Sequence, residues 1–117
     1  MKRIGILTSG GDSPGMNAAV RAVVRAAAFH GVESIGIRNG YSGLISGQLS
    51  SLSIGAVGNL LQRGGTFLGS SRSPEFRKKS GREKAYRVLK AWNISTLITL
   101  GGDGTMAGAG ALSHEFP

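Results

Sequence analysis

The segment RIGILTSGGDSPGMN, residues 3–17, decides the fold of this 117-residue chain. Its first five residues are mostly apolar, which predicts a short buried β-strand. A polar turn with three glycines (Gly10, Gly11 and Gly15) follows, and alanines and valines at helical spacing begin after Met16. A strand, a glycine-rich turn and a helix in this order are the beginning of a βαβ unit.

The sequence beyond this segment completes the unit. The helical spacing runs from Met16 to about His30, and Gly31 is placed to end the helix. A second strand is expected over residues 34–37. Two strands joined through a helix run parallel with a right-handed crossover. The predicted fold is therefore α/β, with a parallel sheet in a Rossmann-like three-layer sandwich that is incomplete.

The rest of the chain is interpreted in the same way. Glycine, asparagine and serine at residues 39–43 and 46–47 indicate turns. The remaining expected elements are an edge strand over 50–53, a short helix over 57–62, a strand over 66–68, a helix over 80–92, a strand over 94–100 and a helix over 106–115. The helix over 80–92 is expected to bury Ala85, Val88, Leu89 and Trp92. There is no internal repeat or linker, and the sequence stops after a helix that would normally lead into another strand. Residues 1–117 are therefore expected to be the N-terminal part of one larger domain, with no second domain present.

Composition excludes several classes of protein. The chain is 40% hydrophobic and 17% charged, has no cysteine, and has no apolar run of roughly 18 residues. A cytoplasmic enzyme fits these features, and neither a membrane span nor a disulfide framework is expected. The net charge of +8 has three explanations: nucleic acid, several small phosphates, or missing acidic sequence. Aromatic residues are only 6% and form no stacking pattern with basic residues, which argues against nucleic acid.

The stretch over residues 8–17, TSGGDSPGMN, is a candidate phosphate site. The chain has 20 glycines, where average usage predicts about eight, and they gather in short turns. Glycines let the backbone approach a ligand closely, and the following helix offers free N–H groups and the positive end of its dipole. The alternative is a tight turn with a helix cap, which explains one or two of the glycines. No Gly-Lys-Ser/Thr closes the turn, so it is not a Walker A loop.

The stretch over residues 101–105, GGDGT, is a candidate metal site. It follows a predicted strand and precedes a predicted helix, and Asp103 stands between glycines. Mg²⁺ prefers one or two carboxylates together with phosphate oxygens and water. One alternative is an aspartate that only caps the helix. A Gly-x-Gly-x-x-Ala dinucleotide pattern also matches residues 102–107, but weakly, because its acidic residue would fall after Pro117.

Three arginines are further candidates. The guanidinium of Arg72, in a serine-rich loop, matches phosphate oxygens and can stabilise a phosphoryl group in transfer; the alternative is an ordinary surface residue. Arg21 and Arg25 are four residues apart on one helix face, where an anion would relieve their repulsion; the alternative is a solvated face. His30 and His114 lack acidic or metal-ligand neighbours and are interpreted as structural.

These motifs together resemble a known family. Residues 3–18 are similar, almost letter for letter, to the opening of bacterial ATP-dependent 6-phosphofructokinases. Gly64-Gly65-Thr66, Ser71-Arg72, Pro74-Glu75-Phe76 and the stretch over 101–105 also follow that family's order and spacing. The resemblance covers essentially the whole chain. The opening motif is specific, whereas GGDGT is shared with NAD kinases and lipid kinases.

The resemblance implies transfer of the γ-phosphoryl group of ATP to the 1-hydroxyl of fructose 6-phosphate, a step of glycolysis in the cytoplasm. Gly11 would contact ATP through its backbone, Arg72 would stabilise the transferred group, and Asp103 would face Mg²⁺. The implied nucleotide contacts are Gly11, Arg72, Ser73, Gly102, Asp103, Gly104 and Thr105. The implied allosteric ADP contacts, at a subunit boundary of a homotetramer, are Arg21, Ala22, Val23, Val24 and Arg25, with a poorer match over residues 54–59. Gly104 favours ATP, because pyrophosphate-dependent relatives usually carry an aspartate there.

One family motif is absent from the sequence. The Thr-Ile-Asp-Asn-Asp stretch that holds the catalytic base, and most sugar contacts, would follow Pro117. The isolated chain is therefore expected to show no useful kinase activity. Two alternatives stay open. The first is another GGDGT-type kinase such as an NAD kinase, against which the turn over residues 8–17 argues. The second is a truncated, inactive nucleotide-binding fragment with an exposed sheet edge.

Overall fold

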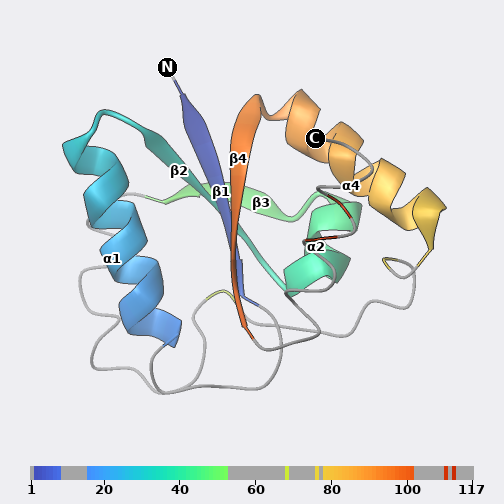
Figure 1. The fold of residues 1–117 in the computed structure, drawn as a ribbon, viewed down its shortest axis with the longest axis horizontal. Helices are drawn as coiled ribbons and strands as arrows, with labels where there is room; N and C mark the ends of the chain where they lie inside the picture. The colour runs from blue at the N-terminus through green and yellow to red at the C-terminus, as the bar shows by residue number, and fades with distance from the viewer. Residues whose placement is uncertain are drawn as a thin grey trace.

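The computed structural model describes residues 2–8, 16–52, 68, 76, 78–101, 110 and 112. A four-stranded sheet is covered by α1 on one face and by α2 and α4 on the other (Figure 1). The elements are β1 (Arg3–Thr8), α1 (Met16–Phe29), β2 (Glu33–Ile37), α2 (Gly40–Ser46), β3 (Leu49–Leu52), α4 (Lys79–Ala91) and β4 (Ile94–Leu100). The predicted three-layer α/β fold is confirmed. No helix in these ranges is long and apolar enough to cross a bilayer.

The sheet is mixed, which corrects the expectation of a wholly parallel one. Its strand order is β3-β2-β1-β4, and β1 runs parallel to both β2 and β4. The edge strand β3 runs antiparallel to β2, with Ile37 beside Leu49 and Ser34 beside Leu52. Only residues 38–48 join these two strands, and a parallel crossover needs a dozen or more. The chain therefore reverses direction after β2, and β3 returns beside β2 in the opposite direction.

Helix α2 is the element that the sequence interpretation missed, because residues 39–47 consist largely of turn-forming types. Asn39 and Gly47 have φ of 60° and 82°, so these left-handed residues lie at the two ends of the helix and not inside it. Gly43 is needed for close approach, since a Cβ there would collide with the carbonyl oxygen of Arg38. Its N–H donates to the Asn39 carbonyl oxygen at 3.1 Å.

Two apolar clusters hold the layers together. On the side of α2 and α4, the buried residues are Leu7, Ile37, Tyr41, Leu44, Phe76, Ala85, Leu89 and Leu112. On the side of α1, they are Ile6, Val20, Val24 and Leu68. Successive side chains of a strand point to opposite faces, so Ile6 and Leu7 place β1 at the centre of both clusters.

The predicted face of the helix over 80–92 is confirmed in α4. Ala85 and Leu89 are buried, Val88 packs against them, and Trp92 follows the helix and is half-buried. Of the other predictions, the helix over 57–62 and all but Leu68 of the strand over 66–68 lie outside the described residues. Gly110 and Leu112 are helical, as predicted, and the rest of that helix lies outside them.

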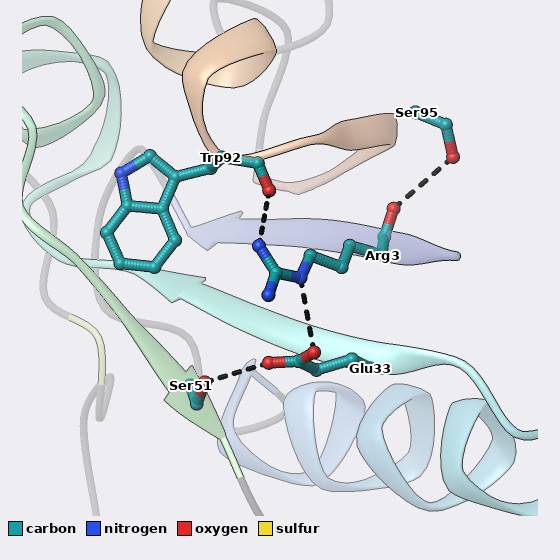
Figure 2. Close-up of polar contacts among 5 residues, drawn as sticks. All are labelled: Arg3, Glu33, Ser51, Trp92 and Ser95. Atoms are coloured by element: carbon teal, nitrogen blue, oxygen red, sulfur yellow. Dashed lines mark hydrogen bonds and ion pairs between the residues drawn. The ribbon is translucent and has the colours of Figure 1, made fainter. Parts of the chain in front are cut away.

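Polar contacts join all four strands at the amino ends of the parallel ones, as Figure 2 shows. The guanidinium of Arg3 donates from Nε to Glu33 Oε2 at 3.1 Å and from a terminal nitrogen to the Trp92 carbonyl oxygen at 2.8 Å. The hydroxyl of Ser51 donates to Glu33 Oε1 at 3.0 Å, and that of Ser95 to the Arg3 carbonyl oxygen at 3.3 Å. We call these five residues the Arg3 network.

Glu33→Gln is expected to change how stability depends on pH. The hydrogen bond from Ser51, and then that from Arg3, lowers the pKa of Glu33 below its ordinary value of 4.5. Because the folded pKa lies below the unfolded one, the carboxylate's contribution is present above the unfolded pKa and is lost as pH falls through the folded pKa. The difference in unfolding free energy between wild type and variant should therefore shrink at acidic pH.

Urea unfolding of both proteins from neutral pH down to about pH 3 measures this difference. Ser51→Ala serves as the matched variant, since it keeps the carboxylate and removes the hydrogen bond that lowers the pKa of Glu33 most. Its dependence of unfolding free energy on pH should lie between those of wild type and Glu33→Gln. Profiles of wild type and Glu33→Gln that stay parallel throughout would contradict the assignment.

Candidate functional site

The two glycine-rich turns leave the sheet side by side. Strands β1 and β4 are neighbours and parallel, and their last residues, Thr8 and Leu100, are paired in register (Figure 1). The turn over residues 9–15 begins directly after Thr8, and GGDGT begins directly after Leu100. Segments far apart in the sequence therefore start from adjacent points on one edge of the sheet.

This edge also has the topology at which α/β proteins bind ligands. The chain leaving β1 enters α1, whose Val20 and Val24 pack with Ile6 on one face of the sheet. The chain leaving β4 reaches helical Leu112, which packs with Leu7 in the cluster on the opposite face. Two adjacent parallel strands whose continuations go to opposite faces form a switch point, and ligands bind in the crevice outside the carboxyl ends of such strands.

The start of α1 faces the same edge, because it follows β1 after one turn. The first turn of this 14-residue helix has no acidic residue. The free N–H groups and the positive dipole end of the helix are therefore not neutralised by a carboxylate within that turn. An anion at this edge would meet a favourable field.

The predicted nucleotide and metal contacts belong to the two glycine-rich turns and to the serine-rich loop around Arg72. Gly11, Arg72, Ser73, Gly102, Asp103, Gly104 and Thr105 lie outside the described residues, as do residues 54–59 and His114. The structure describes the strand ends that precede these two turns, Thr8 and Leu100, together with Gly101. Within the described ranges, no three His, Cys, Asp or Glu side chains gather as metal ligands.

The predicted effector residues lie on α1. Ala22 and Arg25 are exposed, whereas Arg21 and Val23 are half-buried and Val24 is in the core. The Nε of Arg21 is buried and has no hydrogen-bond partner in the part of the chain that the structure describes. A buried donor without an acceptor costs about 1–3 kcal/mol, so this position suits an acceptor from a ligand.

The first and last residues of the predicted phosphate motif over residues 8–17 are polar, and their burial was not predicted from the sequence. Thr8 and Asn17 are 0% and 2% exposed, and hydrophobic periodicity carries no signal for a buried polar side chain. The structure finds them through burial alone. His30, interpreted as structural, is exposed and lies edge-on to Phe29 with ring centroids 5.3 Å apart.

Comparison with known proteins gives consistent matches. The family profile described as Phosphofructokinase matches residues 3–117. The ATP-dependent 6-phosphofructokinases of Bacillus licheniformis and Bacillus subtilis are 60% and 58% identical over 118 aligned positions, which cover 100% of this chain and 37% of each relative. The structure of phosphofructokinase from Saccharomyces cerevisiae superposes with a TM-score of 0.97 at 45% identity, over 100% of this chain and 16% of that chain. The chain thus spans 37% of the length of these bacterial relatives.

Proposed function

This chain belongs to the phosphofructokinase family, and from that premise we propose that it supplies ATP and Mg²⁺ contacts for phosphoryl transfer. The γ-phosphoryl group of ATP would pass to the 1-hydroxyl of fructose 6-phosphate and give fructose 1,6-bisphosphate. The observation that carries the proposal is the pairing of Thr8 with Leu100, which starts both glycine-rich turns at one switch point.

Each turn has a proposed role at the triphosphate. Gly11 contacts the nucleotide through its backbone, and residues 102–105 (Gly102, Asp103, Gly104 and Thr105) approach from the neighbouring strand. Arg72 and Ser73 bind phosphate oxygens, and Arg72 stabilises charge on the transferring group. Asp103 holds Mg²⁺, which supplies positive charge to the phosphate oxygens. The free N–H groups at the start of α1 support the same location for the phosphates.

ATP is the proposed donor in place of pyrophosphate. The bacterial relatives at 60% and 58% identity are named as ATP-dependent enzymes. Gly104 carries no side chain, whereas an aspartate at this position would add bulk and negative charge beside the α-phosphate of ATP. Both the space and the charge therefore favour the nucleotide.

Residues 21–25 are the proposed allosteric ADP contacts. The Nε of Arg21, which is buried without a partner among the described residues, and the exposed Arg25 offer donors to an anionic ligand. Val24 is buried in the core, so its contribution would come from its backbone. A homotetramer in the cytoplasm is the corresponding assembly and location.

The test is a titration of the chain with MgATP, followed by backbone amide NMR. Shifts are expected at the carboxyl edge of the sheet, at Thr8, Leu100 and Gly101. Arg3 and Ser95 are the internal control, because they lie at the amino ends of the same strands. Shifts confined to the amino ends, or none at saturating nucleotide, would refute the proposed site.

A further inference from the structure

Three polar side chains are buried in the part of the molecule that the structure describes. Thr8, Asn17 and Ser34 are the buried polar residues there, at 0%, 2% and 3% exposure. Two of them bracket the turn over residues 9–15. Thr8 and Asn17 each take part in a polar interaction, whereas the Ser34 hydroxyl is buried without a hydrogen-bond partner among the described residues. Burial of a polar side chain in this fold therefore does not by itself ensure a polar partner, and Thr8 and Asn17 differ from Ser34 in having one.

Thr8 is the last residue of β1, directly before the turn over residues 9–15, and it pairs in register with Leu100. Alternation along the strand puts its side chain on the same face as Ile6, which packs against α1. Valine has nearly the same shape as threonine and would fill this space without a polar atom. Packing alone therefore does not account for a hydroxyl at full burial.

Asn17 is the second residue of α1 and occupies the helix's buried stripe. The stripe consists of Asn17, Val20, Val24 and Ala27, at spacings of three and four residues. Val20 and Val24 pack with Ile6 against the sheet, so Asn17 continues this face towards the start of the helix. Its amide has two N–H donors and an acceptor oxygen, near the free N–H groups of the first helical turn. Asn17 and Thr8 thus lie in the same layer, between the sheet and α1.

We propose that Thr8 and Asn17 are positioning residues that fix the two ends of the turn over residues 9–15. They hold its backbone N–H groups in place for the phosphates of a nucleotide, and they touch neither substrate nor metal. The inference rests on the proposed function for its ligand. Hydrogen-bond donors that are already in position bind an anion without the cost of reorganising. Loss of either positioning residue should therefore lower the affinity for the nucleotide while the fold persists.

Thr8→Val tests this with little change in shape. The dissociation constant for MgATP, measured by calorimetry on the 117-residue chain, should rise on the order of tenfold, the equivalent of one lost hydrogen bond. Thr8→Ser keeps the hydroxyl and should bind close to wild type. Asn17→Leu should weaken binding in the same direction. Ser34→Ala is the matched control, because it removes a hydroxyl that has no partner among the described residues, and it should leave the affinity unchanged.

A second measurement needs no nucleotide. Hydrogen exchange of the backbone amides over residues 9–15 should accelerate in Thr8→Val and Asn17→Leu, while the amides of Ile6 and Val20 keep their protection. Unchanged exchange of the turn in both variants would overturn the inference, as would wild-type MgATP affinity in Thr8→Val. A wild-type chain that binds no MgATP would overturn the proposed function instead, and the exchange result would still decide the role of the two anchors.

Discussion

Asp103→Asn is expected to weaken Mg²⁺-dependent ATP binding on the order of a hundredfold, or about 2.7 kcal/mol. The variant keeps the size of the side chain and removes the negative charge that a hard cation prefers. The expected loss is large because GGDGT starts beside the end of β1, where the phosphates would bring the metal. Calorimetric titration with ATP, with and without Mg²⁺, measures it.

The comparison without Mg²⁺ separates a metal ligand from a residue that only shapes the turn. Loss of the carboxylate should leave metal-free ATP binding the same or slightly stronger, since a repulsive charge is removed. Glu83→Gln is the matched control, because Glu83 is an exposed carboxylate on α4 that pairs with Arg87 at 2.9 Å. If Mg²⁺ changed the ATP affinity equally in wild type and in Asp103→Asn, Asp103 would not be a metal ligand.

Gly43→Ala is expected to lower the free energy of unfolding by about 3 kcal/mol or more. The new Cβ would collide with the backbone carbonyl oxygen of Arg38, which cannot rotate away as a side chain would. Moving it would disturb the start of α2, and α2 contributes Tyr41 and Leu44 to the larger cluster. The rings of Tyr41 and Phe76, which stack with centroids 3.9 Å apart, would then separate.

Urea unfolding midpoints of wild type and variant provide the measurement. Gly110→Ala is the matched control, since Gly110 is helical and a Cβ there would meet nothing within 4 Å. That substitution should be neutral or should stabilise by about 0.5–1 kcal/mol, because alanine loses less backbone entropy than glycine in a helix. If the free energy of unfolding of Gly43→Ala were within about 1 kcal/mol of the wild-type value, the backbone at α2 could accommodate a Cβ at this position, and the prediction would be wrong.

The sequence predicted those elements whose pattern is local. The strand over residues 94–100 and the helix beginning at Met16 were predicted correctly because apolar spacing and a flanking glycine turn are both encoded nearby. Helix α2 was missed because Asn39 and Gly47 serve as its ends and Gly43 as a point of close approach. The same residue types also form turns, and the difference lies in the neighbouring backbone.

The direction of β3 and the roles of buried polar groups depend on the tertiary structure. The composition of residues 49–52 favours an edge strand but does not encode whether it runs with or against β2. The two glycine-rich motifs were expected at one ligand, and the pairing of Thr8 with Leu100 places their starting points together. The burial of Thr8 and Asn17 could not be seen in the sequence, because it arises only when α1 packs on the sheet.

The Arg3 network has a practical consequence. It joins the strands at one rim of the sheet, and the glycine-rich turns leave from the other. The polar contacts that join the strands and the proposed nucleotide site thus lie at opposite edges of the same sheet. Substitutions of Arg3 or Glu33 are therefore expected to change the stability of the fold without altering any residue of the proposed nucleotide site.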